Sequence, residues 1–311
     1  MDRLLPSRLV ELVYEKGTGD FALRLCETNS LAEAVPYVTL SYCWGSAQFV
    51  KLRSNNLTEF KKSMSNEILP KTFRDAISVT HQLGQKFIWI DALCIIQDDP
   101  ADWRRESAWM GQIYSGGLLN LTASASTDVE GGLFRPRQVL RIAPCVSKPR
   151  WRGFDNDMLV WYNVENYWRK VYSSPVSQRA WCLQERLLSS RTVHFTENQL
   201  YWECNTFTTS EVDPFPLPKG ADDDLRRMVL LPHLQTSRRY TDPKWTPTKT
   251  EMLNTAWSRL VGAYTQAKLT VKTDKLVAIS GLAHKADKLH THAGGRYLAG
   301  LWEAALPIEL L

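Results

Sequence analysis

Apolar residues recur with two different periods along the first 125 residues of the chain. Residues 37–42, 86–91 and 118–124 are short runs that predict strands, and the run 86–91 is rich in aromatic and β-branched side chains, which is typical of a buried strand. Between these runs, apolar residues in 70–83 and 100–115 recur every three or four positions, which predicts two helices. Strands that alternate with helices favour a parallel, doubly wound sheet.

The second of these helices has a clear start signal. Asp99 fits the N-cap position, and Pro100 fits the first helical position. The loop before it follows the carboxyl end of a strand, where open α/β sheets bind ligands. This loop carries the polar or reactive residues Asp91, Cys94, Gln97 and Asp98.

Further elements are predicted on both sides of this core. Residues 9–14 and 21–26 alternate apolar and polar positions and predict a hairpin, and residues 192–195 and 199–203 predict a second one. A strand is expected within 158–163, and helices are expected at 178–189, 252–265 and 274–286.

The order of these elements divides the chain into three parts. Residues 1–204 are expected to form an α/β core, residues 205–247 a loop or linker rich in Pro, Asp, Thr and Arg, and residues 248–311 a helical part that packs on the core. No apolar run approaches the roughly 20 residues that span a bilayer. The first residues lack the apolar core of a signal peptide. We therefore expect a cytoplasmic protein without membrane contacts.

Composition narrows the chemistry further. The net charge is +5, and the basic residues are spread along the chain, which favours a solvated surface over a nucleic-acid interface. The six cysteines form no C-x-x-C pair, so reduced, mostly buried thiols are expected. Neither dinucleotide-binding nor phosphate-loop glycine motifs occur, and H-E-x-x-H is missing. We expect no bound metal and no resident cofactor.

Four sequence blocks, in this order, resemble a known family: YVTLSYCWG, LPKTFRDAI, FIWIDALCIIQDDPADWRRE and RAWCLQERLLSSR. They are similar to the fungal heterokaryon incompatibility (HET) domain family, and later segments extend the resemblance over nearly the whole chain. Ile96 departs from the family pattern, which usually has Asn there. The resemblance implies a role in non-self recognition and triggered cell death in filamentous fungi, but it specifies no reaction.

A second similarity, to TIR domains, concerns mechanism. Ser41-Tyr42 at the end of a strand and the run Trp181 to Glu185 resemble two TIR elements. The similarity implies a Rossmann-like or flavodoxin-like parallel sheet. In TIR enzymes the corresponding glutamate serves NAD cleavage. The similarity therefore also implies that NAD is a substrate and not a cofactor.

Two carboxylates are the candidate catalytic residues. Glu185 in an aromatic cleft could stabilise an oxocarbenium-like centre while a nicotinamide bond breaks. Alternatively, it is a helix-surface glutamate paired with Arg179 or Arg186. Asp91 could orient a ligand hydroxyl, or it could accept neighbouring backbone N–H groups.

The candidate ligand-binding residues are Tyr42, Trp44, Cys94, Gln97, Arg104 and Trp181. Tyr42 and Trp44 could stack on a flat ring or cover the end of the sheet. Arg104 could hold a phosphate at the helix amino end or be a solvated helix residue. Cys94 could be a nucleophile, but its apolar neighbours favour an inert core thiol. We expect Trp44, Asp91, Gln97 and Glu185 to line one cleft.

Three classes of function fit these observations. The first is a cell-death effector with TIR-like NAD(P) glycohydrolase activity through Glu185. The second is a non-catalytic signalling module that works by assembly, as a homo-oligomer. The third is an enzyme that uses the same cleft on another nucleotide or small molecule.

Overall fold

A mixed sheet organises the computed structural model, which describes residues 5–14, 21–137, 145–147, 159–161, 167–212, 215, 249–290, 296–303 and 306. Its strands are β1 (Arg8–Tyr14), β2 (Phe21–Glu27), β3 (Val38–Ser41), β4 (Phe87–Trp89), β5 (Leu119–Thr122), β8 (Arg191–Phe195), β9 (Leu200–Cys204) and β10 (Thr208–Ser210). Within the described residues these eight strands have the order β10-β9-β8-β5-β3-β4-β1-β2.

The centre of this sheet is parallel. β3 pairs in parallel with β4 and β5, and β5 pairs in parallel with β8, which confirms the predicted pairing of the three core strands. The parallel strands lie side by side in the order β4-β3-β5-β8. When these four strands are numbered by their position along the chain, this order is 2-1-3-4. The connections from β3 to β4 and from β4 to β5 therefore run in opposite directions, and right-handed crossovers place their helices on opposite faces.

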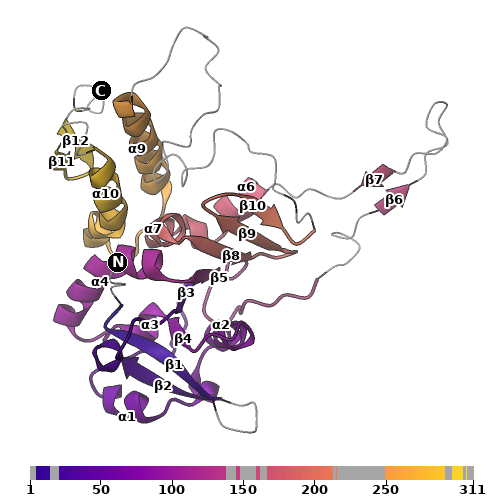
Figure 1. Cartoon of the computed structure of the whole chain (residues 1–311), viewed down its shortest axis with the longest axis vertical. Helices are drawn as coiled ribbons and strands as arrows, with labels where there is room; N and C mark the ends of the chain where they lie inside the picture. Colours follow the sequence, from indigo (N-terminus) through magenta and orange to yellow (C-terminus); the bar gives the residue numbers. More distant parts are fainter. Residues whose placement is uncertain are drawn as a thin grey trace.

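Helix α2 (Lys71–Gln82) lies on one face of the sheet, and α4 (Pro100–Gly116) and α7 (Ala180–Leu188) lie on the other (Figure 1). Local chemistry sets the bounds of these helices. α2 follows Pro70 and ends before Gly84, whose φ of 67° suits a residue without a side chain. The Asp99 carboxylate caps α4 by accepting the N–H groups of Ala101 and Asp102, as the sequence predicted.

One helical turn stands where the sequence predicted only a loop. α3 (Asp91–Cys94) begins directly after β4, and the Cys94 N–H donates to the Ile90 carbonyl. The Ala92 N–H donates to the Asp91 side chain at 2.7 Å. Asp91 therefore starts a short helix at the carboxyl end of β4, and this turn fixes the direction of its carboxylate.

Antiparallel hairpins extend the sheet at both ends. β1 and β2 pair as predicted, and so do β8 and β9. β10 adds one more strand, so residues 208–210 of the predicted linker belong to the sheet. Apart from Phe215, the rest of that linker after residue 212 lies outside the described residues. The predicted strand within 158–163 is β7 (Leu159–Trp161), which pairs with β6 (Cys145–Ser147).

One edge of the main sheet is covered. β2 is the last strand, and its free side forms an isolated antiparallel bridge between Leu23 and Met64. The Met64 N–H donates to the Leu23 carbonyl at 2.8 Å. Helix α1 (Leu57–Lys62) packs against β2 beside this bridge (Figure 1).

The C-terminal helices pack on α7. They are α9 (Lys249–Gln266) and α10 (Val277–His290), followed by the small hairpin of β11 (Tyr297–Leu298) and β12 (Leu301–Trp302). Leu187, Trp257 and Leu282 belong to the hydrophobic cluster between them. α10 also crosses α4 closely, because a Cβ atom on Gly281 would lie 2.8 Å from the Cα of Gly111.

The remaining helices are short: α6 (Tyr167–Tyr172) and the 3₁₀ turns 28–30, 66–68, 176–178 and 272–275. The larger hydrophobic cluster lies around the parallel strands and includes Leu40, Phe73, Trp89 and Leu121. No helix in the described part of the chain is both long and apolar enough to cross a membrane.

Candidate functional site

The carboxyl ends of β3 and β4 meet at the Asp91 side chain. Tyr42 Oη donates to Asp91 Oδ1 at 2.5 Å, and Trp44 Nε1 donates to Asp91 Oδ2 at 2.9 Å. Ala92 N–H is the third donor to this carboxylate. Asp91 therefore ties the chain that leaves β3 to the start of α3. The backbone bond fits the capping interpretation, and the two aromatic donors bring the predicted ring-binding residues to the same carboxylate.

Gln97 closes the loop that follows α3. Its Nε2 donates to the carbonyls of Asp91 and Ile95 at 3.2 and 3.0 Å. The Gln97 backbone N–H also donates to the Leu52 carbonyl, and Leu52 N–H donates to the Ala92 carbonyl. Gln97 thus lies beside Asp91, where the sequence predicted it, and its amide holds the loop shape.

Three other sequence candidates lie elsewhere. Cys94 is fully buried, and burial raises the pKa of its thiol to about 12, which supports the interpretation as an inert core thiol. The Arg104 side chain is exposed on α4. Trp181 packs edge-on against Trp103, with ring centroids 6.5 Å apart, and so joins α7 to α4.

Glu185 points from α7 into the sheet, with only 4% of its surface exposed. It is therefore not a surface glutamate. Burial raises the pKa of its carboxyl group, and the charge of Asp91 raises it further. The positive charge of Arg179 acts in the opposite direction. The helix that carries Glu185 contacts β3, and Tyr42 directly after β3 donates to Asp91.

One oxygen of Glu185 lacks a partner. Oε2 is buried, and no hydrogen-bond donor reaches it within the described part of the chain. A buried acceptor without a partner costs about 1–3 kcal/mol, so such groups are rare in folded proteins and are found at functional sites. The arrangement leaves a carboxylate oxygen available to a group that the chain itself does not supply.

Sequence reasoning missed Tyr114 and Asn120, and it considered Arg179 only as the ion-pair partner of a surface glutamate. Arg179 Nη1 donates to the carbonyl of Tyr42, and nearby acidic groups help to raise its pKa against the effect of burial. Tyr114 Oη donates to the carbonyl of Leu40 at 3.0 Å. Asn120 bonds to Ser41 Oγ at 3.1 Å and is fully buried. A usable signal was present, because Thr39, Ser41, Asn120 and Thr122 are polar at every second position of two buried strands.

A second buried polar cluster holds α7 on the sheet. Arg186 donates to both carboxylate oxygens of Glu203 on β9, at 2.9 and 3.2 Å. His194 Nε2 lies 2.9 Å from the same carboxylate, and His194 Nδ1 lies 3.4 Å from Ser124 Oγ. All of these side chains are buried, so the cluster fixes the position of the helix that carries Glu185.

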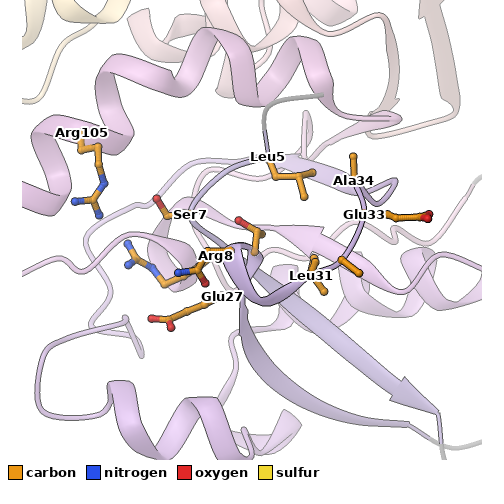
Figure 2. Close-up of a pocket in the computed structure, with 11 residues that line it drawn as sticks. Leu5, Ser7, Arg8, Glu27, Leu31, Glu33, Ala34 and Arg105 are labelled. Carbon is orange, nitrogen blue, oxygen red and sulfur yellow. The ribbon is translucent and has the colours of Figure 1, made fainter. Parts of the chain in front are cut away.

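A separate open pocket of about 600 Å³ lies at the amino end of β1. Figure 2 shows Arg105 extending from α4 towards Ser7 and Arg8, with Leu31 and Ala34 on the opposite wall. Arg8 is already paired with Asp102, and its Nε donates to the Cys94 carbonyl at 2.8 Å. The pocket contains none of the sequence candidates. No group of three metal-binding side chains occurs among the residues that the structure describes.

Comparison with known proteins gives one match. Residues 37–185 match the family model described as Heterokaryon incompatibility protein (HET), which confirms the resemblance over this segment. The matched segment runs from the start of β3 to Glu185 and includes every candidate site residue. No curated protein and no solved structure matches the chain.

Proposed function

Because residues 37–185 match the model of the heterokaryon incompatibility family, we propose that the protein acts in fungal non-self recognition and programmed cell death as an NAD(P) glycohydrolase. The observation that carries this proposal is the buried Glu185 carboxylate oxygen without a partner. The electrostatic interactions of Glu185 with Asp91 and Tyr42 support a shared site near the carboxyl ends of β3 and β4.

The strand order supports the same site. In doubly wound sheets, ligands bind beyond the carboxyl ends of the strands, at the point where the strand order reverses. Here the order 2-1-3-4 reverses next to β3, and Tyr42 and Trp44 follow β3 directly. A flavodoxin-like or TIR-like assignment of the sheet is part of the proposal.

The reaction breaks the bond between nicotinamide and the ribose carbon. Nicotinamide leaves with the electron pair of this bond as a neutral molecule, and positive charge develops on the ribose. The Glu185 carboxylate stabilises this charge, and water then adds to the carbon and releases a proton. A cationic substrate beside Glu185 favours its ionised form, which offsets the effect of burial. Water exclusion strengthens this electrostatic stabilisation.

The test measures nicotinamide release from NAD by the purified chain and by Glu185→Ala. We expect a loss of activity on the order of a hundredfold or more, with a melting temperature close to that of the wild type. Glu197→Ala is the matched control, since Glu197 is exposed in the turn between β8 and β9.

Two results would contradict the proposal in different ways. If the wild type releases no nicotinamide, dilute or concentrated, the hydrolase function is wrong, and assembly or another small-molecule reaction replaces it. If Glu185→Ala is as active as Glu197→Ala, the chemistry lies at another residue, and Asp91 would be tested next.

A further inference from the structure

A lysine ammonium group occupies an aromatic corner beside Asp91. Lys51 Nζ lies 4.5 Å from the centroid of the Trp44 ring and 4.7 Å from that of Phe49. The two rings meet edge to face, with centroids 5.6 Å apart. Both distances from the ammonium are within the range of cation–π attraction. The three side chains are half-buried, so this corner is reachable from solvent.

Among the residues that the structure describes, the two rings are the contacts of this ammonium. In the described part of the chain, no carboxylate lies within ion-pair distance of Lys51 Nζ, so the aromatic faces are its partners. The indole of Trp44 also donates to the Asp91 carboxylate at 2.9 Å. This negative group at the ring edge increases the attraction of the corner for positive charge.

The lysine side chain can leave while its backbone stays in place. Asn56 Nδ2 donates to the Lys51 carbonyl at 2.9 Å. The next residue, Leu52, is bonded through its backbone to Ala92 and Gln97. An ammonium on a flexible stem is strongly hydrated, so water compensates well when it leaves the rings. A flat cation would cover more of both rings and loses less hydration on binding.

We propose that Trp44 and Phe49 form a binding site for a flat organic cation of the pyridinium type, and that Lys51 occupies this site in the free protein. The natural ligand would be the positively charged nicotinamide ring of NAD, and this identification rests on the proposed function. The site itself requires only the geometry of the two rings, the ammonium and the Asp91 carboxylate.

The experiment uses 1-methylnicotinamide as the cationic probe and nicotinamide as the neutral flat control. Dissociation constants for the full chain would be measured by calorimetry. Lys51→Met removes the competing charge and keeps the aliphatic stem. Lys61→Met, on α1, removes the same charge from a lysine that pairs with Glu27. Phe49→Leu removes one ring and leaves the bond from Trp44 to Asp91 intact.

We expect Lys51→Met to bind 1-methylnicotinamide about two- to fivefold more tightly than the wild type, because an exposed cation–π contact no longer competes. Lys61→Met should match the wild type, and Phe49→Leu should bind more weakly. Nicotinamide should not distinguish Lys51→Met from the wild type. Circular dichroism would check that each variant is folded.

The inference is overturned if Lys51→Met binds the cation no more tightly than Lys61→Met does. It is also overturned if folded Phe49→Leu binds as well as the wild type. Neither binding measurement requires cleavage of NAD, so the aromatic site and the glycohydrolase function can be refuted independently. A chain that binds the cation as expected but never cleaves NAD contradicts only the glycohydrolase. A chain that cleaves NAD through Glu185 without a Lys51→Met effect contradicts only the aromatic site.

Discussion

Replacing Gly281 with Ala should destabilise the protein, whereas the same change at Gly262 should stabilise it. Both glycines lie inside helices, and Ala is favoured over Gly there by about 1 kcal/mol. Their surroundings differ. A Cβ atom at Gly281 would lie 2.8 Å from the Cα of Gly111 and 2.7 Å from Gln184 Oε1, while at Gly262 nothing lies within 4 Å.

The magnitude follows from these contacts. Overpacking a close helix crossing costs about 1–3 kcal/mol, and the backbone of α4 cannot move aside as a side chain can. Gln184 Oε1 also accepts the Gly281 N–H at 2.7 Å, and losing this bond costs about 1 kcal/mol. After the gain in helix propensity is subtracted, Gly281→Ala should lower the free energy of unfolding by about 1–3 kcal/mol. Gly262→Ala should raise it by about 0.4–1 kcal/mol.

Urea denaturation of the wild type and both variants measures this difference. The midpoint should fall for Gly281→Ala and rise for Gly262→Ala, with unchanged m values. If Gly281→Ala is as stable as Gly262→Ala, then α4 and α10 do not cross as closely as described, and the reasoning fails. A changed m value would instead mean that the native or unfolded state has a different compactness.

Three further predictions concern titrating and charged groups. Because burial raises the pKa of Glu185 in the folded state, the native protein holds a proton that the unfolded chain releases, and stability is lost as pH rises from about 4.3 through the folded pKa. Glu185→Gln should therefore melt at a higher temperature than the wild type at pH 7 and lose this advantage below about pH 4; a pH-independent difference would contradict the reasoning. Arg186→Met removes the guanidinium partner of the buried Glu203 carboxylate and should cost about 3–5 kcal/mol in urea unfolding. Arg24→Met, at an exposed pair, should cost at most about 1 kcal/mol, and equal losses would contradict the difference in burial. Partial burial raises the pKa of the Cys204 thiol, but hydrogen bonds lower it by more, so this pKa lies below its usual value. Burial raises the pKa of Cys94 to about 12. Peptide mapping after iodoacetamide at pH 8 should find Cys204 labelled well before Cys94, and similar rates would refute the assignment.

The parallel core could be predicted from sequence because its signals are local. The strands and helices each carry their own periodicity, and Asp99 marks the start of α4 by its own chemistry. α3 was missed because a single turn has too few residues to show a period. β10 was missed because its three residues are Thr and Ser, which loops also favour.

The candidate site was only partly predictable for a different reason. Glu185 and Asp91 stood out because motif blocks carried them. Tyr114 lies on α4 and interacts electrostatically with Glu185 on α7, and no local pattern indicates which helices become neighbours. Asn120 offered a clue, because an amide in the middle of a buried strand requires partners.

The Met64 bridge on β2 limits how copies of this chain could associate. An open strand edge exposes a row of unpaired N–H and C=O groups and can recruit a strand from another molecule. On β2, the Leu23 carbonyl is already bonded to Met64 N–H, and α1 packs beside it. A neighbouring chain therefore cannot extend the sheet at this point without first displacing residues 57–64. If the protein polymerises when it signals, we infer that contacts between side-chain surfaces, and not β-augmentation at this edge, would join the copies.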